Sequence, residues 1–345
     1  MNLSRREFGI VLGAAGAAVA TGQADAGPGP GNMRSNFSFK KDEKPAILEV
    51  AINGGTLKER NPLVPETPAE LAEEAIKCFD AGVTIVHFHS NKPNKDLDAA
   101  VEPYAEAMSA IRKTCPYGII YPTANFDPKV YHQQRTVWEP EIQCGHQHAL
   151  AKAGLSNMVL FDTGVLPLAT YDKEGKRQAD NFWWYGFWPG DDDVNERTCK
   201  EFGCGASISV FEPGWMKNVV AMARSGRVPR GSKLNIYFAD YGWAGMAPPI
   251  PEALQLYLHM MEGLDLEWDV GLIGGDIMDT PLARMSLERG GAFRVGLEDW
   301  MDGPSNLDQI KRAKELIAKV GRPLINGPEA IEYLDIPFAA TRPKK

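Results

Sequence analysis

The 345-residue sequence lacks the features of several common protein classes. After its first 26 residues it has no run of about 18 apolar residues, so we expect no membrane span in the mature protein. It has no excess of positive charge: the net charge of −8 argues against nucleic acid or an anionic membrane as partner. It contains no G-x-G-x-x-G after the first predicted strand and no internal repeat. A small molecule is the expected partner.

Cysteine is also scarce. None of the five cysteines forms a C-x-x-C pair, which excludes a zinc ribbon and a thioredoxin-type motif. An oxidising compartment would permit one disulfide, and Cys199 with Cys204 is the candidate pair. The odd number leaves at least one thiol unpaired.

The N-terminus has the order of parts expected of an export signal. Ser4-Arg5-Arg6-Glu7-Phe8 precedes a Gly/Ala-rich apolar run over 9–22, and Ala24-Asp25-Ala26 provides the small-x-small pattern of a cleavage site. We expect residues 1–26 to be a twin-arginine signal peptide that directs the protein to the periplasm. Residues 27–45 are rich in Gly, Pro, Asn and Lys and predict a flexible lead-in.

From residue 46 on, short apolar runs alternate with amphipathic helical stretches. Eight runs have the length and composition of buried strands: Ala46–Ile52, Thr84–Phe88, Gly118–Tyr121, Met158–Phe161, Ala206–Val210, Leu234–Phe238, Trp268–Leu272 and Phe293–Leu297. Between them, Thr67 and Glu70 have the spacing of a capping box. Eight βα units predict an α/β fold, a single TIM (β/α)8 barrel over 46–345 with a C-terminal extension, and an open doubly wound sheet is the alternative.

One connection is too long for a turn. The segment after the fourth strand, between Gly164 and Gly205, contains the aromatic residues from Phe182 to Trp188. A long βα loop on a barrel lies at the catalytic rim, so we expect either a lid or subunit contact, or aromatics that pack the loop onto the barrel.

The pair His87 and His89 is the clearest local signal. Positions two apart on a strand point the same way, so both imidazoles should project from the carboxyl end of the second strand, where barrel active sites lie. Neutral imidazole is a common ligand of zinc. The alternative is a pair of polar residues that merely end the strand.

The eighth strand supplies a second group. Arg294 and Glu298 share one face, and Asp299 follows directly. Glu298 could complete a two-His, one-carboxylate metal site, while Asp299 paired with Arg294 could accept a proton. Taken alone, this pattern favours a buried structural Arg–carboxylate pair that closes the barrel over a catalytic role.

Together these motifs resemble the β-keto acid cleavage enzyme (BKACE) family, which includes the 3-keto-5-aminohexanoate cleavage enzyme. The resemblance is carried, in order, by Ala51-Ile52-Asn53-Gly54, Pro65-x-Thr67-Pro68, Ala81-Gly82, His87-x-His89, Gly245-Met246 and Gly290-Gly291-x-x-Arg294-Val295-Gly296-Leu297-Glu298-Asp299. It covers nearly the whole mature chain.

The resemblance implies an oligomeric TIM barrel that binds zinc through His87, His89 and Glu298, with Asp299 and Arg294 as the proton-transfer pair. It implies a retro-Claisen cleavage with acyl transfer, in which a β-keto acid and acetyl-CoA give acetoacetate and a new CoA thioester. Two-His, one-carboxylate sites also suit Fe(II), Mn(II) and Co(II), so another divalent metal stays open.

The substrate-contacting residues depart from the family pattern. Ser90 and Asn91 follow the histidines where an x-Arg-Asp sequence is common, and Gly274-Gly275-Asp276 stands where Gly-Arg is frequent. We therefore expect a keto acid other than that of lysine fermentation. The candidate substrate-binding residues are Asn53, Thr123, Asn125 and Asp240.

Other polar residues are weaker candidates. Cys144, His146 and His148 have metal-like spacing but are expected to lie in a polar connection before a helix. His132 and His259 are expected to be ordinary helix or loop histidines.

Export and CoA chemistry conflict, because coenzyme A is a cytoplasmic metabolite. A CoA-independent hydrolase or lyase acting on a keto compound with metal-activated water would remove the conflict. A non-catalytic, metal-dependent solute-binding protein is the alternative from another class, although such a protein would need no base beside its metal ligands.

Overall fold

The computed structural model describes residues 43–125, 138–172, 174–187 and 189–341. The strands are β1 (Glu49–Ala51), β2 (Ile85–Phe88), β3 (Ile119–Pro122), β4 (Met158–Asp162), β5 (Val165–Tyr171), β6 (Arg177–Gly186), β7 (Gly205–Val210), β8 (Lys233–Ala239), β9 (Trp243–Ala244), β10 (Glu267–Ile273) and β11 (Ala292–Val295). The helices are α2 (Pro68–Asp80), α3 (Leu97–Thr114), α5 (Pro140–Lys152), α6 (Pro189–Phe202), α7 (Pro213–Arg224), α8 (Pro251–Met260), α9 (Pro281–Glu288), α10 (Asn306–Val320) and α11 (Gly327–Tyr333), with short 3-10 turns at Ile277–Asp279 and Ala339–Thr341. The predicted signal peptide and most of the lead-in lie outside the described residues.

Eight parallel strands form the centre of the fold, and each corresponds to one of the eight predicted runs. Their order is β3-β2-β1-β11-β10-β8-β7-β4, which is sequence order around a ring. β1 pairs with β2 through Ala51 opposite His87, and with β11 through Glu49 opposite Arg294. The predicted TIM barrel is confirmed, and the doubly wound alternative is wrong because the first and last strands pair.

The ring closes between β3 and β4, which lie side by side. Side chains bridge this seam: Asn157 Oδ1 accepts the backbone N–H of Ile120 at 2.9 Å, and Asn157 Nδ2 donates to the Gly118 carbonyl at 3.1 Å. Ser156 Oγ donates to the Ile120 carbonyl at 3.1 Å. Side-chain amide and hydroxyl groups thus satisfy the edge of β3.

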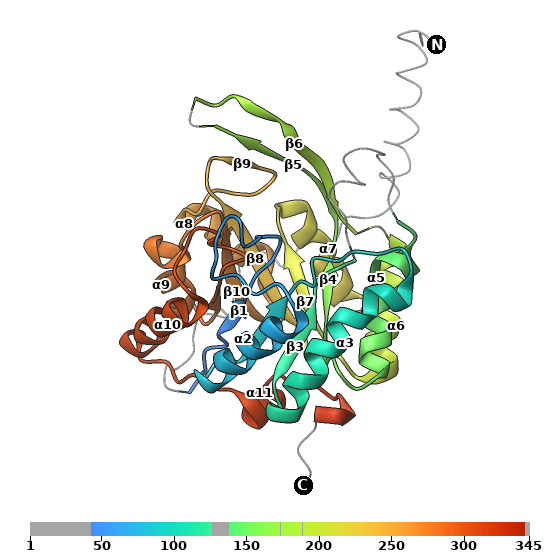
Figure 1. Cartoon of the computed structure of the whole chain (residues 1–345). Helices are drawn as coiled ribbons and strands as arrows, with labels where there is room; N and C mark the ends of the chain where they lie inside the picture. Colours follow the sequence, from blue (N-terminus) through green and yellow to red (C-terminus); the bar gives the residue numbers. More distant parts are fainter. Residues whose placement is uncertain (1–42, 126–137, 173, 188, 342–345) are drawn as a thin grey trace, which may run out of the picture. The chain divides into compact units, whose positions relative to one another are not determined.

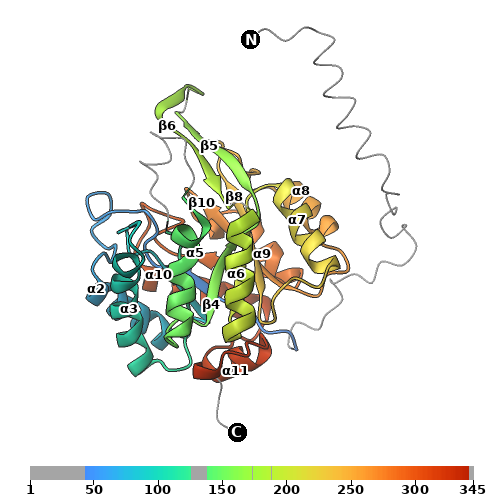
Figure 2. The same ribbon diagram turned by 90° about the vertical axis from the view of Figure 1, so that its right-hand side faces the viewer.

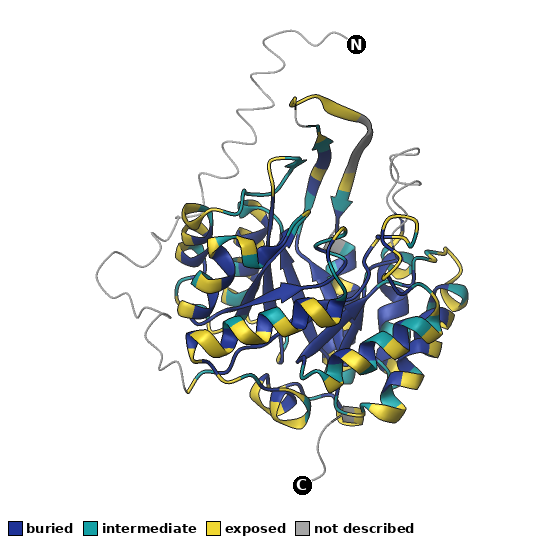
Figure 3. Cartoon of the chain, turned by 60° about the vertical axis from the view of Figure 1, so that its left-hand side comes forward, coloured by how far each residue is buried: buried dark blue, intermediate teal, exposed yellow. Residues whose placement is uncertain are grey.

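The helices surround the strands, with their buried faces toward the strands and their exposed faces outward (Figure 3). The predicted capping box starts α2: Glu70 N–H donates to Thr67 Oγ1 at 3.3 Å, and Thr67 N–H donates to Glu70 Oε2 at 3.0 Å. Between helices and strands lies one continuous apolar core, with Phe88, Phe161 and Phe238 fully buried.

The long connection after β4 is an antiparallel hairpin of β5 and β6, joined by β9 in a three-stranded sheet. It rises beyond the carboxyl ends of the barrel strands (Figures 1 and 2). The predicted loop is therefore mostly strand. Of two successive residues in β6, Tyr185 lines the cavity of the barrel, whereas Trp184 is half exposed. Phe187 is buried, and Trp188 lies outside the described residues.

All five cysteines are free, so the candidate disulfide between Cys199 and Cys204 is not formed. Each thiol instead lies near a backbone carbonyl, Cys199 Sγ 3.7 Å from Gly205 O and Cys204 Sγ 3.6 Å from Ser156 O. Burial raises the pKa of both thiols.

The C-terminal segment lies at the amino ends of the strands. Ile336 packs on Gly231 before β8, and Pro337 packs on Gly203 before β7. Leu324 forms an isolated bridge with Ala46. Within the described part of the chain, no helix has the length and apolar character needed to cross a membrane.

Asn157→Ala should loosen the seam between β3 and β4, because the buried Ile120 N–H loses its partner and the Gly118 carbonyl, which also accepts from Arg112, loses one of its two donors. We expect the free energy of unfolding to fall by on the order of 2 kcal/mol, measured by urea denaturation. The matched control is Glu315→Ala on the exposed face of α10, expected within about 0.5 kcal/mol of wild type. Equal stability of both variants would contradict a closing role for Asn157.

Candidate metal centre

The two predicted histidines meet at the mouth of the barrel. His87 lies on β2 and is buried, and its ring stacks on Tyr121 of β3 at 4.4 Å between centroids. His89 follows the end of β2 and points the same way, with its ring centroid 5.1 Å from that of His87. The alternation of side chains along an extended backbone brings both imidazoles into one space, as predicted.

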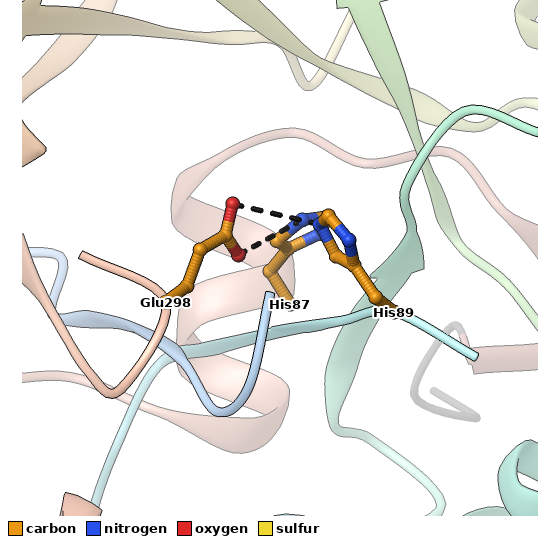
Figure 4. Close-up of side chains that lie close together, drawn as sticks. All are labelled: His87, His89 and Glu298. Atoms are coloured by element: carbon orange, nitrogen blue, oxygen red, sulfur yellow. Dashed lines mark ion pairs between the residues drawn. The ribbon is translucent and has the colours of Figure 1, made fainter. Parts of the chain in front are cut away.

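Glu298 approaches the histidines from the last strand (Figure 4). Its backbone N–H donates to the Ala51 carbonyl of β1 at 3.2 Å, which fixes the turn after β11. Two glycines make room for this turn. A Cβ at Gly54 (φ +56°) would lie 2.3 Å from Glu298 Cγ, and a Cβ at Gly296 (φ +133°) would lie 2.1 Å from the Ala51 oxygen. Both positions therefore need glycine.

The candidate ligand atoms face one another at short distances. His87 Nε2 is 3.4 Å from Glu298 Oε2, and His89 Nε2 is 3.5 Å from Glu298 Oε1. Among the described residues, the buried atoms His89 Nε2 and Glu298 Oε2 have no hydrogen-bond partner. His87 Nδ1 lies 3.2 Å from the Tyr121 carbonyl, and donation there leaves the lone pair of Nε2 directed at the centre.

These atoms fit a divalent metal ion. Within the described ranges, His87, His89 and Glu298 are the group of His, Cys, Asp and Glu side chains with mutually close ligand atoms, all within 4.8 Å. Two imidazoles and a carboxylate leave a position open for substrate or water, as in catalytic rather than structural sites.

The electrostatics favour the metal-binding protonation states. Burial raises the pKa of Glu298, but Arg294, His89 and His87 together hold it well below its usual range. Burial lowers the pKa of His87 to about 3. At neutral pH Glu298 is therefore a carboxylate and His87 a neutral imidazole.

Behind the metal site lies a layer of buried charges. Arg294 donates to both oxygens of Asp299, at 2.9 and 2.6 Å, and lies 3.2 Å from Glu298 Oε1 and 3.4 Å from Glu49 Oε1. On the opposite side of Glu49, Lys233 Nζ lies 2.9 Å from Oε2 and also pairs with Asp269.

This layer has two cations, Arg294 and Lys233, and four carboxylates. If all are ionised, two negative charges are unbalanced. Burial raises the pKa of Asp269 and of Asp299 to about 6 despite the opposing cations. A divalent cation on Glu298 would supply the missing positive charge, which is a second, independent reason why a metal fits.

Arg294, Glu298 and Asp299 were identified from the sequence, but the other three charged residues of this layer were not. These three are Glu49, Lys233 and Asp269, which lie within or beside the apolar runs predicted to be strands. The signal in the sequence was a charged residue at a position where a buried strand is otherwise apolar. Tyr121 extends the layer: its hydroxyl donates to Glu49 Oε1 at 2.7 Å.

The metal site lies at one side of a cavity of 680 Å³ at the carboxyl ends of the strands. Arg294 faces the cavity, whereas Asp299 does not line it and lies behind the guanidinium. The two residues predicted to transfer a proton are thus in contact, but only Arg294 lines the cavity.

Two of the four predicted substrate-binding residues line the cavity and two do not. Thr123 and Asn125 line the cavity, although the Asn125 amide bonds the backbone of Asn94 and Ile142. Asn53 is fully buried outside the lining. Its side chain accepts from His89 N–H and donates to His89 O, both at 2.9 Å, so it fixes the metal-site backbone. Asp240 is exposed, also outside the lining, and accepts from Gly242 N–H at 2.9 Å.

Cys144, His146 and His148 lie within α5, not in a connection before a helix, because the helix begins earlier, at Pro140. His146 is buried, and its Nε2 lies 2.7 Å from the Thr123 carbonyl. His148 bonds Thr198. His132 lies outside the described residues, and His259 is on α8, 3.8 Å from Glu262.

A parallel eight-stranded barrel with titratable groups at its carboxyl end belongs to the TIM-barrel class. More narrowly, the chain belongs to the β-keto acid cleavage enzyme family, whose model matches residues 45–336.

Curated relatives agree with this assignment. The 3-oxoadipate:acetyl-CoA acetyltransferase of Cupriavidus necator is 28% identical over 85% of this chain and 96% of the relative. The 3-keto-5-aminohexanoate cleavage enzyme of Acetoanaerobium sticklandii is 23% identical over 84% of this chain and 98% of the relative. The 3,5-dioxohexanoate:acetyl-CoA acetone transferase of Paraburkholderia graminis is 23% identical over 81% and 92%. A structure of apo ObcA, 14% identical, aligns with 80% of this chain and 66% of that protein at a TM-score of 0.53, which supports the fold alone.

Gly54→Ala should displace Glu298, because the new Cβ would overlap its side chain. We expect at least tenfold weaker metal binding, measured by titration of the metal-free protein with Zn²⁺. The adjacent Gly55→Ala is the control, since no atom lies within 4 Å of a Cβ there. Similar zinc affinity in both variants would show that Glu298 does not need this space.

Proposed function

We propose that this protein cleaves a β-keto acid by retro-Claisen chemistry with transfer of the acyl group. The observation that carries the proposal is the placement beside one cavity of three candidate metal ligands, His87, His89 and Glu298, and of Arg294, which is paired with Asp299 behind it. Family membership and the names of the relatives support the same reaction class.

We propose zinc as the metal, because two imidazoles and one carboxylate match its catalytic sites, while Fe(II), Mn(II) and Co(II) use similar ligands. When bound, the ion would act as a Lewis acid on the keto oxygen. Tyr121 and Asn53 hold His87 and His89 for this purpose through the contacts described above.

The Arg294–Asp299 pair is proposed to take a proton from the substrate. Transfer of a proton from Arg294 Nη2 to Asp299 Oδ1, along their 2.6 Å hydrogen bond, would leave a neutral guanidine facing the cavity. That guanidine then accepts the proton on the carbon between the keto and carboxylate groups. The two pKa values oppose this transfer on its own: burial raises the pKa of Asp299 only to about 6, while the anions around Arg294 hold the pKa of its guanidinium well above the usual range. The pair therefore acts as a base only if Arg294 takes up the substrate proton as it passes its own proton to Asp299.

We propose acetyl-CoA as the acyl partner, supported by the relatives that are named for it. The balanced reaction exchanges acyl groups: the keto acid R-CO-CH2-COO⁻ and acetyl-CoA give acetoacetate and R-CO-CoA. We also propose export through residues 1–26, supported by the twin-arginine pattern. If the exported protein acts where CoA is absent, water is the alternative acceptor.

A binding protein without turnover is the alternative from another class. The Arg294–Asp299 pair argues against it, because ligand capture by a metal needs no buried proton acceptor next to the ligands.

Glu298→Gln and Asp299→Asn should separate metal binding from turnover. The first removes a ligand charge, so we expect loss of bound zinc by mass spectrometry. The second should retain about one zinc per chain and lower kcat by about 10² to 10⁴, the range of general acid–base catalysis. Equal loss of zinc in both variants would contradict these roles.

Dependence on CoA decides the acceptor. With purified zinc-loaded protein and a 3-oxo acid, we expect cleavage only when acetyl-CoA is added, with acetoacetate formed in equal amount to the new thioester. Cleavage at an unchanged rate without acetyl-CoA would establish water as the acceptor.

A further inference from the structure

The cavity is divided by charge. Its charged and imidazole side chains all come from the side formed by β2, β11 and the segments after them: His87, His89, Lys92, Arg294 and Glu298. Within the described residues, no lining side chain from β4 through β10 is a Lys, Arg, His, Asp or Glu.

The uncharged side is built by seven consecutive strands or the residues after them. Its apolar and aromatic surface is formed chiefly by Leu160, Leu168, Phe211, Tyr237, Trp243 and Ile273. The polar atoms here belong to hydroxyl groups, such as that of Ser209, and to the Trp243 indole. Phe211 stacks on Tyr237 with centroids 4.5 Å apart, which gives this wall a flat aromatic face.

The hairpin sheet covers this side. Leu168 of β5, Tyr185 of β6 and Trp243 of β9 all line the cavity, and β5 holds β9 through Thr170 opposite Trp243. Trp243 reaches inward over Gly274 (φ +93°), where a Cβ would lie 3.1 Å from the indole nitrogen. The three residues thus add apolar and aromatic surface to this side of the cavity.

A carboxylate lies behind this wall but does not face the cavity. Asp162 is fully buried and outside the lining, and the Tyr185 hydroxyl donates to its Oδ2 at 2.6 Å. A substrate ammonium group would thus meet the ring and hydroxyl of Tyr185 rather than an anion.

We propose that this apolar side binds the group R of the keto acid, and that R is an uncharged alkyl or aryl group rather than one bearing a second carboxylate or an ammonium. The inference rests on the proposed function, which places the keto and carboxylate groups at the metal side. A charged R would lose its hydration without gaining a partner, whereas each methylene of an alkyl R gains about fourfold in affinity when buried.

Calorimetric binding of 3-hydroxy acids to the zinc-loaded protein tests this without turnover, because these analogues have no keto group to cleave. We expect the Kd to fall about fourfold per added methylene from 3-hydroxybutyrate to 3-hydroxyoctanoate. We expect 3-hydroxyadipate and 3-hydroxy-5-aminohexanoate to bind at least tenfold more weakly than 3-hydroxyhexanoate. Tighter binding of either charged analogue, or no binding of any neutral one, would overturn the proposal.

Variants locate the effect. Leu168→Ala and Trp243→Ala should flatten the dependence on chain length, while Trp184→Ala, on the exposed side of the same hairpin, should leave it unchanged. Ile273→Lys should weaken 3-hydroxyoctanoate and strengthen 3-hydroxyadipate, a gain that damage to the fold cannot produce. An unchanged dependence in all of these variants would place R elsewhere.

The two proposals fail separately. If neutral analogues bind in the expected order but no 3-oxo acid is cleaved, the apolar side is supported and the proposed function is wrong. If 3-oxo acids are cleaved and the charged analogues bind best, the function is supported and the apolar assignment is wrong.

Discussion

The site depends on the ion pairs that Arg294 forms with three carboxylates. Asp299, Glu298 and Glu49 all lie within 3.4 Å of its guanidinium inside the barrel. Burying these acids without a cation would cost several kcal/mol each or force them to take up protons. Because one guanidinium joins the last strand to the first and also contacts Glu298, the pairing of these strands and the candidate metal site share one electrostatic arrangement.

The position of Glu298 depends on its backbone as well as on its ion pairs. Its N–H is held by the carbonyl of Ala51, and Gly54 and Gly296 leave no space for larger residues beside it. The strands thus place the histidines through simple alternation, while Glu298 depends on two left-handed glycines contributed by two different strand exits. Ligands that come from a strand tolerate more surrounding change than one that comes from such a turn.

Features set by periodicity and by local motifs could be predicted from the sequence. The eight apolar runs, the capping box at Thr67 and the projection of His87 and His89 all depend on neighbours in the chain. Features that depend on distant contacts could not. Glu49 and Lys233 form an ion pair with each other although they are 184 residues apart in sequence. In the sequence, each therefore looks like a single charge that interrupts an apolar strand. Asn53 was predicted to contact the substrate. Its side chain instead bonds the backbone of His89, a contact that depends on the pairing of β1 with β2.

Residues 44–46 are held at the amino ends of the barrel strands by backbone contacts, which fixes where the chain enters the barrel. Arg322 donates to the carbonyls of Lys44 and Pro45, and Ala46 bridges to Leu324, all at the amino ends of the strands. The cavity opens at the other end of β1, where Gly55 lines it. Residues 44–46 are therefore anchored at the end of β1 remote from the candidate metal ligands, so a mature chain that starts near residue 43 would have its terminus away from the cavity.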